Sequence, residues 1–542
     1  MNTLSSRRSF LKAIAGGGVT LSAMSPWAAN ASSHRKPNIV FIIVDDMKRH
    51  MFNCLPEGKG RNLSPNIDRL AAEGTLLMGQ HVVSPVCTPS RFNCLTGRYA
   101  SRSRSANFVR STRQHGQTVI GWNTHILADD VTLPRLLKRQ GYKTGFVGKN
   151  HTVFAPGYKK LPYQADPTTR EAKARLRENA RAIKQAMYAS GFDYAASIYH
   201  NNPDGNGPRA LAVHNLDWIA KGALDFIDEN KDGPFFLYFA STVPHGPTVK
   251  ERSWGADRRI TADGIMDEPV SVLGNSEDLP KRLRKAGIDQ PGRENILWLD
   301  DAVGALISRL EKHRLDDNTI IFFFTDHGQD AKGTIYQGGV SDPSIVWRKG
   351  GFPCGSVNNA IVSNIDFAPT ILDYAGRSSS GIDFDGRSFR PVLEAKAEEI
   401  HDSLYFEMGY TRGVRKGRWK YVALRYPERA RNMSLAERKA ILERSNAKLR
   451  ERGKKVRCID PSAPFSHISL IPGGGDAEAA STGKYAGYYD ADQLYDLSSD
   501  PGEQKNLANN PKYSGILDQM KHELKKYLDQ LPGGFAEIKT VS

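Results

Sequence analysis

Three runs of consecutive apolar residues, many of them β-branched or aromatic, constrain this chain of 542 residues most strongly. They span residues 38–44, 234–240 and 319–324. Runs without polar alternation predict strands that are buried on both faces of a sheet. Segments with helical spacing lie between and around them, at 66–73, 132–140, 215–229 and 294–313. This alternation predicts an α/β fold with a large, mostly parallel central sheet flanked by helices.

Each apolar run is followed by polar side chains. Asp45 and Asp46 follow the first run, His245 comes shortly after the second, and Asp326 and His327 come shortly after the third. Ligands of parallel sheets bind where the carboxyl ends of the strands meet, so we expect these side chains to lie together. Adjacent carboxylates repel unless a cation lies between them. Three carboxylates favour Ca²⁺ or Mg²⁺, and a histidine among them would also suit Zn²⁺ or Mn²⁺.

The chain changes character near residue 400. Short alternating segments at 403–406 and 418–424 predict a small antiparallel sheet, and 512–531 predicts a final helix. Residues 427–488 are rich in Arg and Lys and are interpreted as a basic insertion. We therefore expect a main α/β domain over 34–400 and a smaller C-terminal α+β subdomain over 401–542.

The first 33 residues are typical of an export signal. Arg7 and Arg8 precede a weakly apolar run, and small residues at 29–31 suit a cleavage site. Paired arginines in this setting predict a twin-arginine signal, and therefore a partner in the twin-arginine export machinery. No later apolar run approaches the roughly 20 residues of a membrane span. We expect a protein without a transmembrane segment that is periplasmic or secreted.

The charge of the chain points to an anionic partner. Lys and Arg number 75 against 59 Asp and Glu, for a net charge of +16. Three of the basic residues lie in the first 33 residues, so the mature chain would carry about +13. Such an excess suits nucleic acid, anionic lipid or an acidic polymer. Nucleic acid is not expected, because basic and aromatic residues are not interleaved in any motif.

One of the five cysteines stands in a distinctive setting. An odd count leaves at least one cysteine without a disulfide partner, and a buried structural thiol is the ordinary interpretation. Cys87, however, opens the pattern C-x-P-x-R, which ends at Arg91 and is followed by Leu-Thr-Gly-Arg at 95–98. This pattern resembles the signature of the type I sulfatases, members of the alkaline phosphatase superfamily. The resemblance implies that Cys87 is a modified residue, oxidised by a maturation enzyme to formylglycine (3-oxoalanine).

Further ordered matches extend the resemblance over about residues 37–510. The N-terminal matches are the opening strand with its two aspartates, G-K-x-H at 148–151 and P-H-x-P at 244–247. The later matches are T-D-H-G at 325–328, Lys332 with the Tyr-Gln-Gly-Gly turn at 336–339, and the C-terminal segments 494–497 and 500–507. In character the chain is similar to exported bacterial polysaccharide sulfatases. The region 34–400 would then be the catalytic domain.

The resemblance implies a role for each matching residue. One Ca²⁺ per chain, with Mg²⁺, Mn²⁺ or Zn²⁺ less favoured, would be held by Asp45, Asp46, Asp326, His327 and the modified Cys87. Arg91 would hold the formylglycine. Lys149, His245 and Lys332 would bind the sulfate oxygens, and His245 or Lys332 would protonate the leaving alcohol. His151 would then take a proton from the remaining hydroxyl of the formylglycine hydrate so that sulfate is expelled.

Basic residues that follow the cysteine suggest a binding channel for a sulfated polysaccharide or oligosaccharide, although a charge run is commonly a solvated face. The candidate substrate-binding residues are Arg98, Arg102, Arg104, Arg110, Arg113, His115 and the segment beginning with His200, Asn201 and Asn202.

Three departures from the family pattern concern the surroundings of the site. Asn150 stands where Trp is usual, Gln337 where Glu is commoner, and Ser341 and Asp342 replace the usual Arg-Val. Two other functions remain open from the residues alone. One is a phosphate or phosphonate monoester hydrolase of the same superfamily, and the other is a non-catalytic module that binds polyanions.

Overall fold

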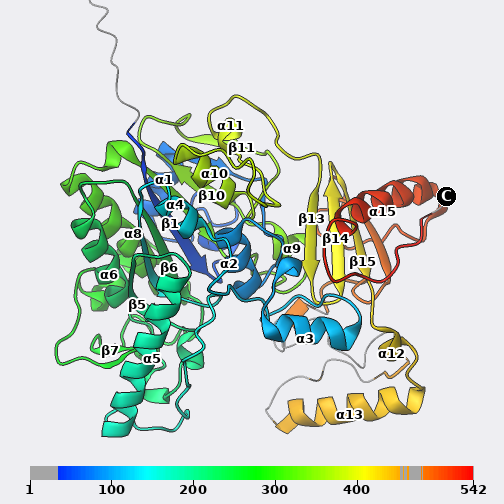
Figure 1. Ribbon diagram of the computed structural model, residues 1–542, viewed down its shortest axis with the longest axis horizontal. Coiled ribbons are helices and arrows are strands. Elements are labelled where there is room, and N and C mark those ends of the chain that lie inside the picture. Colours follow the sequence, from blue (N-terminus) through cyan, green and yellow to red (C-terminus); the bar gives the residue numbers. More distant parts are fainter. Residues whose placement is uncertain are drawn as a thin grey trace, which may run out of the picture. The chain divides into compact units, whose positions relative to one another are not determined.

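The central sheet contains eight strands, seven of which run in one direction (Figure 1). The computed structural model describes residues 35–451, 456, 460–462, 478, 480–481 and 483–540. Within them the strand order is β11 (Ser356–Asn358), β2 (Thr75–Leu77), β10 (Ser344–Trp347), β9 (Thr319–Thr325), β1 (Asn38–Asp45), β6 (Phe235–Pro244), β4 (Lys143–Lys149) and β5 (Tyr194–Tyr199). Only β10 is antiparallel to its neighbours. The predicted α/β fold is confirmed.

The two faces of the sheet support separate hydrophobic cores. Along β1, Ile39, Phe41 and Ile43 belong to one core, and the alternate residues 40, 42 and 44 belong to the other. Every residue of β1 is buried, which explains why its sequence is continuously apolar. One face is covered by α2 (Cys87–Thr96), α4 (Leu133–Lys138), α5 (Arg170–Ala189) and α10 (Phe367–Tyr374), and the other by α1 (Pro65–Glu73), α6 (Leu216–Glu229) and α8 (Glu294–Lys312).

The strand register brings the predicted polar residues to one edge. Val44 of β1 lies opposite Thr325 of β9, and Asp45 lies opposite Pro244 of β6. The backbone N–H of Asp326 donates to the carbonyl of Val44 at 2.9 Å, so the segments remain hydrogen-bonded where β1 and β9 end. The expected clustering at the carboxyl edge follows directly from this register.

A second sheet occupies the C-terminal part of the chain, as the alternating segments predict. Its antiparallel strands are β13 (Leu404–Met408), β14 (Thr411–Lys416), β15 (Trp419–Leu424) and β16 (Asp492–Asp496), and α15 (Ser514–Leu528) packs against it through Met520 and Leu524. Buried polar contacts join this sheet to the rest of the chain. The N–H of Ser101 donates to Glu407 at 3.0 Å, and Arg412 donates to the carbonyl of Thr118 at 2.6 Å.

The region between β15 and β16 holds the predicted basic insertion. Its described part includes α12 (Glu428–Arg431) and α13 (Leu435–Glu451), whereas the Gly-rich stretch near 473–475 lies outside the described residues. The domain limits at 34, 401, 427 and 488 stay predictions. The twin-arginine segment and Cys458 also lie outside the described residues. The other four cysteines lie within the described residues and are free.

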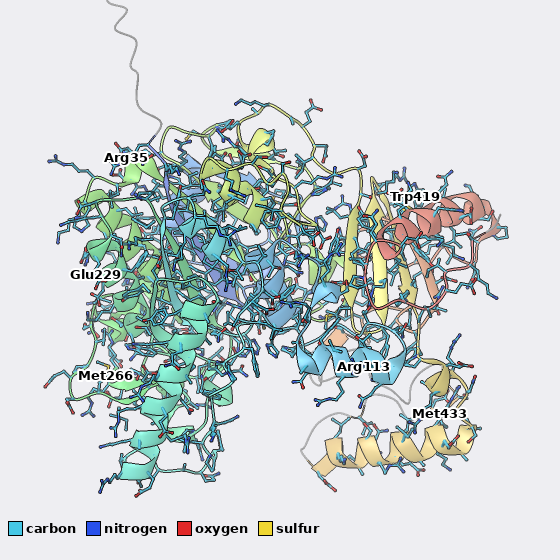
Figure 2. All side chains as sticks on the ribbon, in the orientation of Figure 1. Arg35, Arg113, Glu229, Met266, Trp419 and Met433 are labelled. Carbon is cyan, nitrogen blue, oxygen red and sulfur yellow. The ribbon has the colours of Figure 1, made fainter. Side chains whose placement is uncertain are left out.

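Figure 2 shows the side chains on the same ribbon, and smaller elements lie between those already described. They are α3 (Ala106–His115), α7 (Leu279–Lys285), α9 (Gln337–Val340), α11 (Arg390–Leu393), and the two-stranded pairs β3 (Gln80–His81) with β12 (Val362–Ser363) and β7 (Ile260–Thr261) with β8 (Gly264–Ile265). Among the helices of the described residues, none combines the length and apolar character that crossing a membrane requires.

A glycine bulge shapes the end of β4. The pairing of β4 with β5 shifts between Val147 and Gly148, and Gly148 has φ +91°. A Cβ atom at Gly148 would lie 1.8 Å from the carbonyl oxygen of Ala240 in β6. The close approach of β4 to β6 therefore requires glycine immediately before Lys149.

Replacing this glycine should destabilise the protein far more than replacing a glycine with the same conformation in open space. Gly148→Ala adds a backbone clash to left-handed strain and should lower the free energy of unfolding by about 3 kcal/mol. Gly141→Ala is the matched control, because Gly141 has φ +81° and nothing within 4 Å of the added Cβ. Strain alone should cost about 1 kcal/mol there. Chemical denaturation measures both, and equal losses would show that the clash does not matter.

Candidate active site

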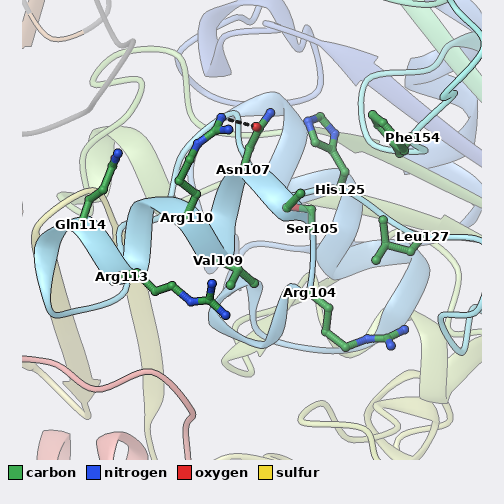
Figure 3. A pocket seen from close by; sticks show the side chains of 11 residues that line it. Arg104, Ser105, Asn107, Val109, Arg110, Arg113, Gln114, His125, Leu127 and Phe154 are labelled. Atoms are coloured by element: carbon green, nitrogen blue, oxygen red, sulfur yellow. Dashed lines mark hydrogen bonds between the residues drawn. The ribbon is translucent and has the colours of Figure 1, made fainter.

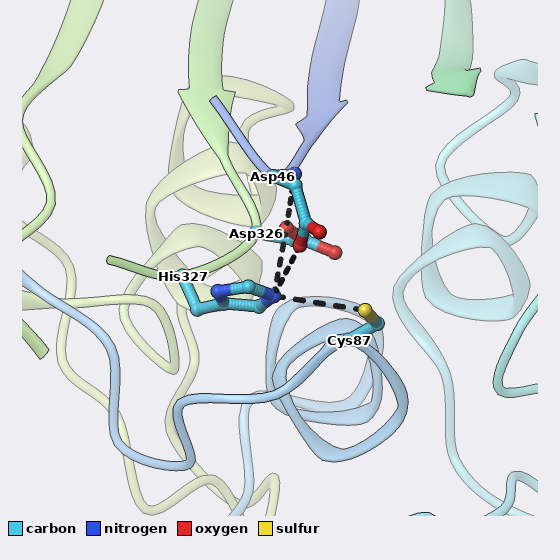
Figure 4. A group of neighbouring side chains, drawn as sticks. All are labelled: Asp46, Cys87, Asp326 and His327. Carbon is cyan, nitrogen blue, oxygen red and sulfur yellow. Dashed lines mark hydrogen bonds and ion pairs between the residues drawn. The ribbon is translucent and has the colours of Figure 1, made fainter. Parts of the chain in front are cut away.

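Four side chains at the carboxyl edge of the sheet form a compact, largely buried group (Figure 4). Asp46, Cys87, Asp326 and His327 each place one possible ligand atom within 4.8 Å of the others. His327 Nε2 lies 3.1 Å from Asp46, 3.4 Å from Asp326 and 3.6 Å from Cys87 Sγ. Asp45 adjoins the group, since its Oδ1 lies 3.6 Å from the same sulfur. The five predicted metal-ligating residues are thus brought together.

Backbone geometry turns two consecutive aspartates toward one centre. The β1–β6 register shifts between Ile43 and Asp45, and Asp46 takes a left-handed φ of +62°. In a regular strand adjacent side chains point to opposite faces, whereas here both carboxylates approach the cysteine and histidine. Aspartate tolerates this conformation better than most residues. The left-handed conformation of Asp46 lies at the point where two carboxylates converge.

The helix α2 presents Cys87 and Arg91 to the same centre. Cys87 is the first residue of α2, where the positive end of the helix dipole lies, and every residue of the helix is buried. Arg91 follows one turn later on the same face. Its Nη2 lies 3.1 Å from Asp326 and 3.7 Å from Asp45, and all three side chains are fully buried. This arrangement explains the spacing of the cysteine and arginine in the sequence.

Three further basic side chains lie against the aspartates. Lys149 Nζ lies 2.5 Å from Asp45, and Lys332 Nζ lies 2.6 Å from Asp46. His245 Nε2 is 3.4 Å from Asp46. All three residues were predicted from the sequence as ligands of a sulfate group. Positive groups therefore approach the carboxylates from several sides of the centre.

The charges of this cluster hold its carboxylates ionised. Burial by itself would raise the pKa of Asp45, but the charges of Lys149, His245, Arg91 and Lys332 bring it well below the usual value. Burial opposes ionisation of Asp46 too, and Lys332 and His327 lower its pKa far more than burial raises it. Both groups are therefore negative at neutral pH and available to a cation.

His151 is set up to remain neutral. Burial lowers the pKa of its imidazole well below the usual value, and the ammonium of Lys149 lowers it further. Its Nδ1 is buried and has no hydrogen-bond partner among the described residues. A neutral imidazole beside a cationic centre can accept a proton, which is the role the sequence predicted.

The rim of the site contains amide side chains that orient the histidines. Asn202 Nδ2 lies 2.8 Å from His245 Nε2, and Asn150 Nδ2 lies 3.2 Å from His200 Nδ1. Asn150 thus makes a polar contact with the ring of His200. The sequence analysis missed Gln329, whose Nε2 donates to Asp46 at 3.1 Å. Its position two residues after His327 was the available signal.

The C-terminal sheet holds the loop that carries Lys332. Glu503 accepts a hydrogen bond from the backbone N–H of Gln337 at 2.5 Å and pairs with the buried Lys420 of β15 at 2.8 Å. Gln337 follows Lys332 in the same loop. The glutamate of the C-terminal motif is therefore a structural anchor of the active-site loop.

Several predicted substrate-binding residues have partners outside this cluster. Arg98 pairs with Asp383, and Arg102 forms a double contact with Asp385 at 2.8–3.0 Å. His115 Nδ1 lies 3.2 Å from the hydroxyl of Tyr410. The remaining basic residues of the predicted channel, Arg104, Arg110 and Arg113, line a separate cavity. The structure thus divides the basic segment into residues whose partners lie elsewhere and residues that line this cavity.

Comparison with known proteins agrees with the fold and the site. The sequence matches the family described as Sulfatase over residues 37–377, and it matches the C-terminal region of N-sulphoglucosamine sulphohydrolase over 325–435. The first match covers more than half of the chain and includes the cysteine, the aspartates and the lysines described above. The chain belongs to the sulfatase family, and it is a sulfuric ester hydrolase.

Two relatives illustrate this membership. The N-acetylgalactosamine-6-sulfatase of Mus musculus is 27% identical over 421 residues, which cover 72% of each chain. An ulvan-active sulfatase of Formosa agariphila is 24% identical over 496 residues, covering 90% of this chain and 78% of the relative. Both matches extend over most of the protein.

Solved structures share the fold. A structure from work on the metabolism of multiple glycosaminoglycans by Bacteroides thetaiotaomicron aligns with a TM-score of 0.57 at 20% identity, covering 91% of this chain and 99% of the other. The phosphonate monoester hydrolase of Silicibacter pomeroyi aligns with a TM-score of 0.54 at 18% identity, covering 91% and 96%. This chain therefore shares its fold with both of these proteins.

Removing the buried guanidinium of Arg91 should destabilise the protein more than removing the partly exposed guanidinium of Arg98. Arg91→Ala removes the buried guanidinium that pairs with Asp326 and Asp45, and should cost about 3–5 kcal/mol of stability. Arg98→Ala is the control, because Arg98 pairs with an aspartate that is 72% exposed and should cost at most about 1 kcal/mol. Urea denaturation of both variants measures the difference, and a loss at Arg91 no larger than at Arg98 would contradict the electrostatic account.

Proposed function

We propose that the chain hydrolyses sulfate esters of a sulfated polysaccharide or oligosaccharide, with formylglycine derived from Cys87 and a bound divalent cation, Ca²⁺. The observation that carries this proposal is the position of the Cys87 sulfur. It lies 3.6 Å from both Asp45 Oδ1 and His327 Nε2, inside a buried group of carboxylates and cations. A structural thiol would need no such surroundings.

Buried polar groups beside Cys87 support its conversion to formylglycine. Among the described residues, Arg91 Nε and Nη1 and Thr88 Oγ1 are buried without a hydrogen-bond partner. A thiol accepts hydrogen bonds poorly, whereas the hydrated aldehyde of formylglycine offers two oxygens. When present, formylglycine supplies a geminal diol, whose second hydroxyl allows sulfate to be eliminated instead of hydrolysed from a stable ester.

The donor set fits a hard divalent cation. Asp45, Asp46 and Asp326 offer carboxylate oxygens and His327 offers a ring nitrogen. Neighbouring charges hold Asp45 and Asp46 ionised. The bound cation would supply charge that lowers the pKa of a nucleophilic oxygen. Calcium is favoured because oxygens outnumber nitrogens in the set.

The protein side chains divide the remaining tasks. Lys149, Lys332 and His245 offer N–H donors around the place where the equatorial sulfate oxygens would lie, and they stabilise negative charge as it develops. His245 or Lys332 delivers a proton to the leaving alcohol. His151, neutral through its lowered pKa, accepts the proton whose removal expels sulfate.

The relatives and the charge of the chain support a glycan substrate. The relatives described above are named for a sulfated amino sugar and for ulvan. The net charge of +16 favours a polyanion. Export by the twin-arginine route, to the periplasm or the medium, would bring the enzyme to such a polymer, and folding before export suits a buried site of this kind.

The mass of the peptide containing residue 87 tests the nucleophile. Protein purified from its native host should carry formylglycine in place of cysteine. Cys87→Ser should accept sulfate once and then stall, because its single hydroxyl allows no elimination. A stable mass increase of one sulfate on the variant, with loss of turnover, is the expected result. Unconverted cysteine in active protein would refute the formylglycine mechanism.

Phosphate ester hydrolysis is the alternative that the shared fold suggests. Rates of hydrolysis of matched sulfate and phosphate monoesters of one sugar separate the two. The proposal requires a clear preference for the sulfate ester, and a preference for the phosphate ester would replace it with the alternative.

Binding of the cation should be visible as thermal stability without any assay of activity. Calcium at about 100 times its dissociation constant should stabilise the protein by about 2.7 kcal/mol, and a chelator should reverse the effect. Asp326→Asn should abolish the calcium-dependent shift. Asp385→Asn is the control, because Asp385 pairs with Arg102 away from the cluster, and this variant should keep the shift. An unchanged shift in Asp326→Asn would place the cation elsewhere.

A further inference from the structure

A cavity of about 780 Å³ lies beside α3, apart from the cluster around Cys87 (Figure 3). This volume is typical of pockets that bind small ligands, which span roughly 300–1,000 Å³. Arg110 and Arg113 extend from α3 on one side, and His125, Leu127 and Phe154 contribute from two other segments. None of the described residues that line the cavity is acidic.

The wall of this cavity is continuous with the active-site loop. Ile126 and Val153 form a parallel bridge, with hydrogen bonds from Ile126 N to Thr152 O at 2.8 Å and from Phe154 N to Ile126 O at 3.0 Å. The segment 125–127 is thereby fixed to the loop that carries His151. Phe154 lies three residues after His151 in the same loop. The cavity is therefore joined through this loop to His151.

Two arginines of the cavity are available to an anion. Arg104 is neutralised by Asp129 at 2.9 Å and Asp130 at 2.6 Å. Arg110 donates to the amide oxygen of Asn107 at 2.6 Å, and no carboxylate of the described chain pairs with Arg110 or Arg113. Both arginines are exposed, so a ligand could reach them. Arg113 lies in the last turn of α3, where the helix dipole favours positive charge.

The cavity also offers apolar surface. The Phe154 ring is 50% exposed and lies 6.3 Å from the ring of His125, centroid to centroid. Val109 and Leu127 add aliphatic surface to the lining. Aromatic and aliphatic surface next to guanidinium groups suits a ligand with an apolar ring face and anionic substituents. An anionic sugar has both features.

We infer that this cavity is a subsite for an anionic sugar residue, a uronate or a sulfated sugar, that neighbours the residue whose sulfate is cleaved. The substrate is then an oligosaccharide or polysaccharide with negative charges on at least two sugars. Arg110 and Arg113 bind the carboxylate or sulfate of the neighbouring residue, and Phe154 contacts its ring. This inference rests on the proposed function and names its substrate more closely.

The test compares ligands of increasing length. Dissociation constants would be measured by calorimetry for the monosaccharide N-acetylgalactosamine 6-sulfate, for chondroitin 6-sulfate tetrasaccharides and for ulvan oligosaccharides. At least one longer ligand should bind more tightly than the monosaccharide. In the double variant Arg110→Ala/Arg113→Ala this advantage should fall by roughly 5- to 10-fold, the effect of two exposed charge contacts.

A charge-matched control separates a subsite from general attraction. Arg177→Ala/Arg181→Ala removes two exposed arginines one turn apart on α5, and no ion pair of either is found in the described chain. This control should keep the full advantage of the longer ligand. An equal loss in both double variants, or no advantage of length in the unaltered protein, would overturn the subsite.

Sulfate release from the same ligands tests the proposed function separately from the subsite. A length advantage that depends on Arg110 and Arg113 but is accompanied by no sulfate release would refute the proposed function and keep the subsite. Sulfate release without that advantage would keep the function and refute the subsite.

Discussion

Electrostatic balance at the carboxyl edge of the central sheet is the constraint on which the rest of the site depends. Asp45, Asp46 and Asp326 are forced close together by the parallel register of β1 and β9. Buried carboxylates at such distances are tolerated only when cations oppose them. Lys149 and Arg91 provide two of these charges from β4 and α2, so strand, helix and loop are coupled through one centre.

The fold accepts local irregularity in order to build this centre. A shift in the register of β1 and the left-handed φ of Asp46 turn two neighbouring carboxylates inward. Near the end of β4, Gly148 allows a close approach to β6 immediately before Lys149, the last residue of the strand. Both irregularities lie at strand ends, where few ladder hydrogen bonds are lost. The irregular backbone of Asp46 and Gly148 thus lies where it orients side chains toward the site and where the sheet tolerates it.

The C-terminal sheet contributes to the site without supplying a group to its centre. Glu503 and the buried Lys420 form an ion pair, and the same glutamate accepts from the backbone of Gln337. Because Gln337 lies just after Lys332, this contact limits the freedom of the loop that carries a proposed sulfate ligand. The family's C-terminal motif therefore has a physical explanation in positioning, although it lies far from Cys87 in the sequence.

Sequence alone determined the α/β class, the polar residues at the strand ends and the motif around Cys87. These features were readable because unbroken apolar runs report burial on two faces, and because C-x-P-x-R places two groups one helical turn apart. Only the tertiary structure decided how the basic residues after the cysteine divide. Arg98 is engaged by Asp383, some 285 residues away in the chain, whereas Arg110 and Arg113 face a cavity. The local sequence does not distinguish arginines that pair with carboxylates from those that do not, because the carboxylate partners are brought close only by folding.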